Sequence, residues 1–357
     1  MPIRKFYGCR LLICNTPNAN GKDVMLNKLI KRVNKNYDLK IKKKSLIKKD
    51  SAMVVKLTDQ SGTKYALKTL YTNKQRQEFI ARSELLLSKK GVKLAKPIPT
   101  TDNKLYFIYR GHPYVLYEWA EGERHPLNNS KDLESLVKTI AGMHKASYNL
   151  NFPKKTKVYR NTNWNREYKK RLKFIKQFYQ TNKNSVHPRL QAYLHALPFF
   201  SNMGKKALKL LANSKADSLS KKYKEQILVH GDAHQGNILN HDQEKTIIDL
   251  EDIRYDLPSK DLIRIFAKYT KRHKFEGEVF EKMLNSYEKI NPLGKKKRKV
   301  VLIDFLFPNT IYRMLRLKKY KIQSLGEVKE IIKQEKKMAR YISQLLANYD
   351  EKDPTSA

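Results

Sequence analysis

The chain has 357 residues, of which 40% are hydrophobic and 31% are charged. That hydrophobic content supports a sizeable core and excludes wholesale disorder, a collagen-like repeat and a small disulfide-stapled domain. Lys and Arg number 75 against 34 Asp and Glu, and the resulting net charge of +41 favours anionic partners: nucleic acid, acidic polysaccharide, phosphorylated protein or a membrane surface.

The only two cysteines, Cys9 and Cys14, lie close together near the N-terminus. A disulfide framework or a four-ligand zinc site needs more residues, so we expect both thiols to be reduced. The sequence has neither the apolar region of a signal peptide nor a run of 18 apolar residues. We therefore expect a protein without a membrane span that is made in the cytoplasm.

The N-terminal part of the chain is predicted to be rich in β-strands. A short basic helix over 23–36 comes first, and a helix over 74–90 separates two groups of strands. β-branched and aromatic residues cluster between polar breaks in each strand, and the DQSG at 59–62 is a hairpin turn. The predicted strands are 40–48, 52–58, 64–70, 104–109 and 113–119.

After residue 125 the apolar pattern becomes helical. The predicted helices are 164–182, 189–213, 259–273, 277–289 and 326–349, with a further one that carries Leu133, Leu136, Val137, Ile140 and His144 on one face. Residues 226–250 form an island of short strands around polar turns. The whole pattern predicts an α+β fold with an N-terminal extension (1–25), an N-lobe (26–120) and a C-lobe (121–357). A cleft is expected between the lobes.

The segment LVHGDAHQGNIL at 228–239, followed by IIDLED at 247–252, carries the clearest chemical pattern. Asp232 precedes Asn237 by five residues, and Asp249 follows twelve residues later. The catalytic loop of protein kinases, H-R-D-x-x-x-x-N with a metal-binding Asp beyond it, has the same order and spacing. An Asp can accept the proton of an attacking hydroxyl, while an Asn oxygen and a second carboxylate hold Mg²⁺ on the phosphates. The pattern therefore predicts phosphoryl transfer.

Two other interpretations of this segment are open. HGD can cap a strand, with the later Asp residues acting only as turn formers. His230, Asp232 and His234 could instead be zinc ligands of a hydrolase, because His-x-Asp-x-His can coordinate a metal. The compound pattern argues against the first interpretation, and the lack of a further ligand cluster in the sequence argues against the second. His144, on an apolar helix face, is expected to be a core histidine rather than a ligand.

HGDxHxxN followed by IID resembles the aminoglycoside phosphotransferase and choline kinase group, which shares the protein-kinase fold. Within that group, the chain is similar to bacterial spore coat kinase-like proteins of the CotS type over about residues 25–345. The segments that carry this similarity are YALK at 65–68, PYVLYEWAEG at 113–122, IDLEDIRYDLPSKDL at 248–262, NPL at 291–293 and FLFP at 305–308.

The resemblance implies a role for each matching residue of the catalytic segment. Asp232 would be the catalytic base, and Asn237 and Asp249 would hold magnesium. Three residues would support the loop without taking part in the chemistry: His230, His234 and Asp261. For Asp261 an equal alternative is a carboxylate in the first turn of a helix, stabilised there by the helix dipole.

The resemblance also implies nucleotide contacts in the N-lobe. Lys68 matches the kinase strand lysine and would hold the α and β phosphates of ATP. It would pair with a carboxylate of the following helix, for which Glu78 is preferred and Glu84 is the alternative. The stretch KDSAM at 49–53 takes the place of the phosphate-covering loop, but it contains no glycine and excludes a protein-kinase-type glycine loop.

The predicted hinge between the lobes consists of Glu118, Trp119 and Ala120. Its backbone groups would bind adenine, as the resemblance implies. Packing between the lobes is an equal and compatible role for the Trp119 ring.

We therefore expect a spore coat-associated protein that transfers a phosphoryl group from ATP, with Mg²⁺, to a hydroxyl or amine. It would be made in the mother cell and incorporated into the coat, with a coat protein or polysaccharide as candidate acceptor and other coat proteins as partners. The alternative is a coat scaffold that keeps the fold without the activity. Nucleic-acid binding rests on charge alone and lacks a motif. Aminoglycosides are polycations that need acidic pockets, so a chain this basic disfavours them as acceptors.

Overall fold

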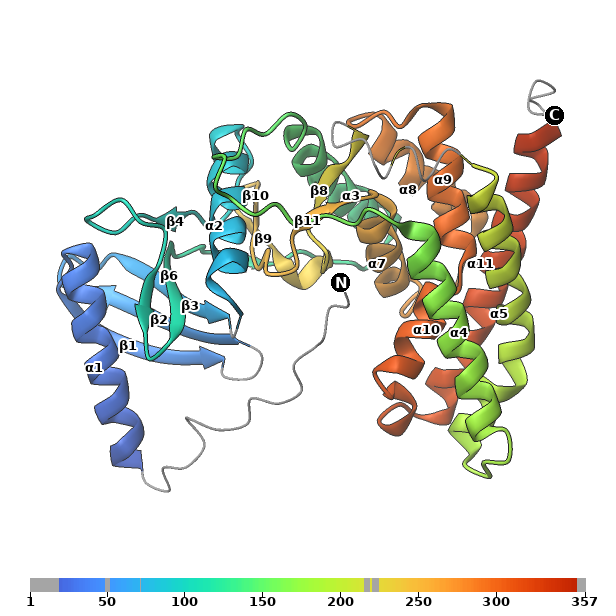
Figure 1. Cartoon of the computed structure of the whole chain (residues 1–357), viewed down its shortest axis with the longest axis horizontal. Helices are drawn as coiled ribbons and strands as arrows, with labels where there is room; N and C mark the ends of the chain where they lie inside the picture. Colours follow the sequence, from blue (N-terminus) through green and yellow to red (C-terminus); the bar gives the residue numbers. More distant parts are fainter. Residues whose placement is uncertain (1–18, 49–51, 71, 215–218, 220–224, 352–357) are drawn as a thin grey trace. The chain divides into compact units, whose positions relative to one another are not determined.

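The protein is described by a computed structural model over residues 19–48, 52–70, 72–214, 219 and 225–351 (Figure 1). Its contacts divide the chain into two units. The first takes the described residues up to Ala81 together with Lys96–Trp119, and the second takes Arg82–Ala95 and the described residues from Ala120 onward. Cys9, Cys14 and residues 49–51 of the predicted phosphate-covering segment lie outside the described residues.

The first unit is built on a six-stranded antiparallel sheet in the order β1-β2-β3-β6-β4, with β5 also paired to β6. The strands are β1 (Ile41–Lys48), β2 (Ala52–Asp59), β3 (Lys64–Leu70), β4 (Pro97–Ile98), β5 (Phe107–Tyr109) and β6 (His112–Glu118). At the predicted turn, the Asp59 carboxylate accepts hydrogen bonds from the Ser61 hydroxyl at 2.6 Å and the Thr63 amide at 3.0 Å. These bonds close the hairpin between β2 and β3.

The core of the first unit follows from the two-residue period of its strands. Met53, Val55 and Leu57 alternate along β2 and are all buried. Helix α1 (Ala19–Tyr37) adds Val33 and Tyr37 to the same cluster. The Tyr37 hydroxyl accepts a hydrogen bond from the Leu116 amide of β6 at 3.3 Å, which ties the helix to the sheet.

The second unit is mainly helical (Figure 1). Helix α2 (Lys74–Lys89) begins in the first unit and ends in the second. The later helices are α3 (Ser130–Ala146), α4 (Trp164–Asn182), α5 (Pro188–Ala212), α7 (Ser259–Tyr269), α8 (Gly277–Glu288), α9 (Gly294–Leu306), α10 (Asn309–Arg316) and α11 (Leu325–Glu351), with the short 3₁₀ turn η3 (Lys319–Lys321). Ile175 of α4, Leu197 of α5 and Val328 of α11 belong to one buried cluster, so these three helices share a core.

Two small sheets interrupt the helices of the second unit. β8 (Ile227–Val229) pairs antiparallel with β11 (Arg254–Asp256). β9 (Ile238–His241) lies between β10 (Glu244–Ile247) and β7 (Glu123–Arg124). The 3₁₀ turn η2 (Gln235–Asn237) leads directly into β9. Of these strands, β8, β9 and β10 lie within the segment 226–250 that the sequence predicts to form short strands.

The predicted α+β class is confirmed, with a β-rich first unit and a helical second unit. The helix predicted over 259–273 ends at Tyr269, and α9 and α10 were not predicted. The basic run 295–299 forms the first turns of α9, where Lys297 pairs with Glu225 at 2.7 Å and Arg298 pairs with Glu288. Among the described helices none combines the length and apolar character that a membrane span requires.

Candidate active site

The loop that carries Asp232 turns sharply after β8. Gly231 has φ +83°, in the left-handed region that favours glycine. A Cβ at this position would lie 2.5 Å from the carbonyl oxygen of Asp252, so a side chain would collide with the backbone that leads into β11. The glycine of HGD is therefore required by the close approach of two backbone segments.

Asp261 of α7 holds the backbone of this loop. Its buried carboxylate accepts hydrogen bonds from the amides of His230 at 2.6 Å and Gly231 at 2.8 Å. Nε2 of His144 lies 3.0 Å from the same carboxylate, and Nδ1 of His144 lies 2.9 Å from the Tyr287 hydroxyl. Burial raises the pKa of Asp261, but the hydrogen bond and charge of His144 and the loop amides together hold that pKa below its ordinary value. His144 is a core histidine with both nitrogens bonded, as expected.

His230 joins the loop to the strand end before Asp249. Its Nδ1 accepts a hydrogen bond from the Asp232 amide at 3.3 Å, so its Nε2 carries the proton and donates to the Ile248 carbonyl at 3.0 Å. Burial lowers the pKa of His230, opposed by the charge of Asp261. The ring is therefore neutral, and it supports the loop through hydrogen bonds alone.

The carboxylate of Asp232 contacts two side chains. One oxygen forms an ion pair with Arg264 of α7, and the other lies 3.6 Å from Nε2 of His234. Burial, with the charge of Lys268, lowers the pKa of His234 to about 4, so this ring is neutral at pH 7. The Asp232 side chain remains 30% exposed, which leaves it open to a ligand.

Asn237 and Asp249 lie at the same end of the β9–β10 hairpin. The Ile248 amide donates to the Asn237 carbonyl at 3.0 Å, just beyond the pair formed by Ile238 and Ile247. The Asn237 side-chain amide donates to the Asp232 carbonyl at 3.0 Å, which commits its nitrogen and leaves its oxygen as an acceptor. Asp249 has φ +69°, a conformation that costs a residue with a Cβ about 1–2 kcal/mol.

The donor set fits magnesium better than zinc. Across the described ranges, no three His, Cys, Asp or Glu side chains gather as a metal site. Both ring nitrogens of His230 are engaged within the loop, which argues against the zinc hypothesis. Mg²⁺ takes one or two protein oxygens and completes its shell with water and phosphate oxygens, and the Asp249 carboxylate and Asn237 amide are oxygen donors of that kind.

The residues predicted to hold the phosphates lie on β3 and α2. Lys68 is in the centre of the first unit's sheet, opposite Val54 of β2 and Val115 of β6. Glu78 shares the first unit with Lys68, whereas Glu84 is buried and belongs to the second unit. The choice of Glu78 as the partner stays a prediction.

The predicted hinge begins at Glu118, the last residue of β6. The Glu118 amide donates to the Lys96 carbonyl at 2.9 Å and the Trp119 amide donates to the Lys64 carbonyl at 3.3 Å. Nζ of Lys56 lies 4.2 Å from the centroid of the Trp119 ring, so this ring packs against a cation of its own unit. Binding of adenine by the backbone groups of Glu118, Trp119 and Ala120 stays a prediction.

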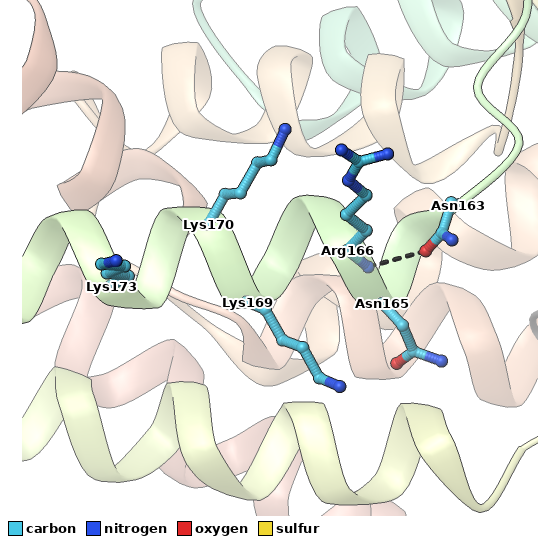
Figure 2. A pocket seen from close by; sticks show the side chains of 6 residues that line it. All are labelled: Asn163, Asn165, Arg166, Lys169, Lys170 and Lys173. Carbon is cyan, nitrogen blue, oxygen red and sulfur yellow. Dashed lines mark hydrogen bonds between the residues drawn. The ribbon is translucent and has the colours of Figure 1, made fainter. Parts of the chain in front are cut away.

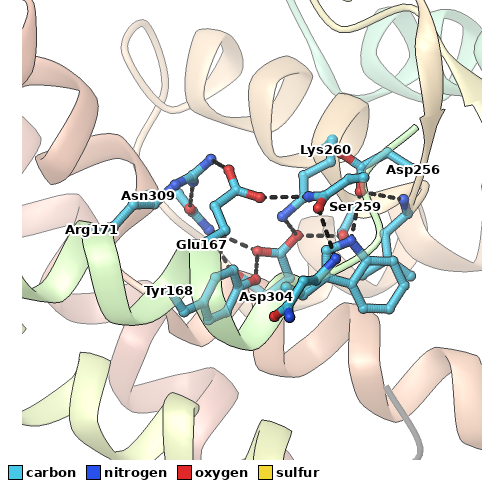
Figure 3. A network of polar contacts seen from close by, with 12 residues as sticks. Glu167, Tyr168, Arg171, Asp256, Ser259, Lys260, Asp304 and Asn309 are labelled. Atoms are coloured by element: carbon cyan, nitrogen blue, oxygen red, sulfur yellow. Dashed lines mark hydrogen bonds and ion pairs between the residues drawn. The ribbon is translucent and has the colours of Figure 1, made fainter. Parts of the chain in front are cut away.

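A buried polar network fixes the start of α7 and hence Asp261 (Figure 3). Asp304 of α9 accepts hydrogen bonds from the Ser259 hydroxyl at 2.5 Å and from the hydroxyl of Tyr168, and its carboxylate lies 2.9 Å from Nζ of Lys260. Burial raises the pKa of Asp304, but the charge of Lys260 and these hydrogen bonds hold it below its ordinary value. The network therefore contains a stable carboxylate and fixes the first turn of α7.

A separate pocket of about 480 Å³ lies along α4 (Figure 2). It is lined by Asn163, Asn165, Arg166, Lys169, Lys170 and Lys173. Asn163 accepts the amide of Arg166 at 2.7 Å and caps the helix. None of the predicted site residues lines this pocket, so it is a basic surface apart from the catalytic segment.

The sequence did not identify Arg264 and Lys268, the cations beside Asp232 and His234. Both follow Asp261 on one helix, at i+3 and i+7, and therefore share its face. This spacing is the signal that could have found them, since α7 turns the face that holds Asp261 toward the loop. No sequence pattern indicates that His144 bonds to Asp261.

Solved structures with the same fold are phosphotransferases. An aminoglycoside phosphotransferase from Alicyclobacillus acidocaldarius superposes with a TM-score of 0.69 at 16% identity, over 90% of this chain and 94% of that one. An amicoumacin kinase in complex with AMP-PNP, Ca²⁺ and Ami gives 0.61 at 17% identity, over 91% and 99%. A choline kinase from Cryptosporidium parvum gives 0.54 at 12% identity, over 90% and 97%. The predicted protein-kinase-like fold is confirmed.

A protein family described as "Spore coat putative kinase YutH" matches residues 30–354. The match includes the loop from His230 to Asn237, Asp249, and Asp261, whose carboxylate holds the loop backbone. The expected relationship to spore coat kinase-like proteins is confirmed, and the chain belongs to this spore coat kinase family.

Proposed function

We propose that the protein transfers the γ-phosphoryl group of ATP to a hydroxyl or amine, with Asp232 as the general base. The bond from the γ-phosphorus to the bridging oxygen breaks and ADP leaves, while a bond forms from phosphorus to the acceptor. The acceptor proton passes to the Asp232 carboxylate and then to solvent. Membership of a spore coat family supports a role in the coat.

The observation that carries this proposal is the arrangement of Asp232, Asn237 and Asp249. The side chain of Asn237 bonds to the Asp232 backbone, and the hairpin brings Asn237 and Asp249 to one end. Asn237 and Asp249 would hold Mg²⁺, which would supply positive charge to offset that of the phosphates. Lys68, paired with Glu78, would hold the α and β phosphates, and Ala120 would donate to adenine.

A coat scaffold without turnover is the second candidate, and the ion pair between Arg264 and Asp232 favours it. This ion pair occupies one oxygen of the proposed base. A scaffold would tolerate that arrangement, whereas an enzyme must present the other oxygen to its acceptor.

The test of the proposed function is the melting temperature of the full chain with ATP and Mg²⁺ together and with each alone. A ligand that binds only the folded state raises its stability by about 2.7 kcal/mol at one hundred times its Kd. We expect a rise of several degrees with Mg·ATP and none with Mg²⁺ alone. No rise with Mg·ATP would favour the scaffold.

A further inference from the structure

Three cations of the second unit lie near one another, and one of them contacts the carboxylate of Asp232. Arg264 forms an ion pair with it, and Lys268 follows one turn later on α7. Arg313 of α10 acts electrostatically on both Arg264 and Lys268. We call Arg264, Lys268 and Arg313 the cation cluster.

Within the described part of the chain, the cation cluster has positive charges without carboxylate partners and a hydrogen-bond donor without an acceptor. The Arg264 side chain is only 16% exposed, yet its Nε is buried without a hydrogen-bond partner. Among residues 19–48, 52–70, 72–214, 219 and 225–351, Lys268 and Arg313 form no ion pair with a carboxylate. Unused donors in a half-buried site indicate that a ligand completes it.

Like charges in the cluster oppose one another. Burial and the charge of Arg313 lower the pKa of Arg264 to about 9. Burial, then the charge of Arg264, lowers the pKa of Lys268. Burial and the charge of Arg316 lower the pKa of Arg313, opposed by Asp252. An anion among these groups would remove the repulsion, and guanidinium groups bind carboxylate and phosphate oxygens through paired hydrogen bonds.

The cluster lies where an acceptor must approach. Asn237 bonds to the backbone carbonyl of Asp232, so the proposed metal ligands are on the backbone side of this residue. Arg264 instead contacts the carboxylate, which is the group that must meet the reacting hydroxyl. The charges of ATP already have partners in the proposed function, namely Mg²⁺ and Lys68.

We propose that the acceptor is an anion: a hydroxyl compound that also carries a carboxylate or phosphate group, which the cation cluster binds beside Asp232. This inference rests on the proposed function and specifies its substrate class. The anionic group binds without reacting, and the neighbouring hydroxyl attacks the γ-phosphorus while its proton goes to Asp232. Cationic acceptors would be repelled.

The test is calorimetric titration of the full chain, saturated with Mg·AMP-PNP, with four matched sugars: glucuronate, glucose 6-phosphate, glucose and glucosamine. We expect at least one of the two anions to bind about tenfold or more tightly than glucose and glucosamine. The comparison between glucuronate and glucose 6-phosphate separates carboxylate from phosphate recognition. Lys268→Gln and Arg313→Gln should each weaken anion binding about tenfold or more, the effect of one charged hydrogen bond.

Two control variants accompany the test. Lys138→Gln removes the same charge from an exposed position on α3 and should leave anion binding unchanged. Arg313→Lys keeps the charge and should keep most of the binding, even if Arg313→Gln folds poorly. All variants should bind AMP-PNP within about threefold of the parent protein.

Failure of this inference is distinguishable from failure of the proposed function. Equal binding of anionic and neutral sugars, or anion binding that survives both Lys268→Gln and Arg313→Gln, would overturn the anionic acceptor while nucleotide binding stands. Absence of AMP-PNP binding would overturn the proposed function. The sugar titration without nucleotide would then still decide whether the cluster selects anions.

Discussion

The carboxylate of Asp261 is fully buried, and it accepts hydrogen bonds from two loop amides and from a histidine ring. Each bond is charge-assisted, and the amides belong to His230 and Gly231, immediately before Asp232. The position of the proposed base therefore depends on a residue that lies beyond the HGDxHxxN segment.

We predict that Asp261→Asn lowers the free energy of unfolding by about 3 kcal/mol, the usual cost of breaking a buried charged network. The amide cannot accept both loop amides and the His144 proton as a carboxylate does. The folded-state pKa of Asp261 lies below its ordinary value of 3.8. The stability that its carboxylate contributes is therefore complete above pH 3.8 and is lost as the pH falls through the folded-state pKa. Urea unfolding between pH 7 and pH 3 measures both effects. Equal stability and equal acid sensitivity in the two proteins would contradict this account.

Asp249 adopts φ +69° although it is not glycine. Strain of this kind is held by the surrounding structure, and here it coincides with a proposed metal ligand. We predict that Asp249→Gly is more stable than Asp249→Ala by about 1 kcal/mol, because glycine adopts this conformation without a Cβ clash.

The same two variants should both lose the Mg·ATP-dependent rise in melting temperature. Thermal unfolding with and without Mg·ATP measures stability and ligand binding in one experiment. An undiminished rise in either variant would rule out Asp249 as a metal ligand.

The residues of the loop can be named from the sequence because the motif is local. His230, Asp232 and Asn237 fall within eight residues, and Asp249 follows after one hairpin. Arg264 could not be found in the same way, because its contact with Asp232 depends on how α7 packs against the loop. Single cations are also uninformative in a chain with 75 Lys and Arg.

At the level of elements, α9 shows where periodicity fails. Residues 300–306 are all buried, so the second half of the helix has no polar face and no amphipathic pattern. Its first half is the basic run 295–299, which on sequence alone resembles a solvated charge cluster. By contrast α4 has an amphipathic pattern, and its predicted bounds of 164–182 match those observed.

The network around Asp304 connects α9, α4 and α7, and it predicts a strong stability effect. Lys260 is 8% exposed, so Asp304→Ala would remove the carboxylate that pairs with its buried charge. We predict a loss of about 3–5 kcal/mol in the free energy of unfolding. Urea unfolding of the variant checks the value.

The double variant Asp304→Ala/Lys260→Met should be more stable than Asp304→Ala alone, because it removes the unpaired charge as well. A double-mutant cycle therefore separates the cost of the charge from the loss of packing. Purely additive effects of the two substitutions would show that the ion pair does not stabilise the network.

At the level of the whole molecule, the net charge of +41 bears on the chemistry of the partners, whereas the family match bears on the type of protein. The charge predicts anionic partners in general, and the cation cluster turns that general expectation into a specific site. Residues 82–95 join the second unit across a boundary that local sequence patterns do not mark. The cause is tertiary: the amide of Ala95 bonds to the Ile247 carbonyl at 3.3 Å.

As the proposed base in phosphoryl transfer, Asp232 should contribute little to nucleotide binding. The decisive measurement compares the parent protein with Asp232→Asn in two assays: calorimetric binding of Mg·AMP-PNP, and ADP release from Mg·ATP in the presence of a coat extract. We predict dissociation constants within about threefold, or roughly 0.7 kcal/mol. ADP release should fall by about 10² to 10⁴, the usual cost of losing a general base. Equal ADP release from the two proteins would contradict this role of Asp232.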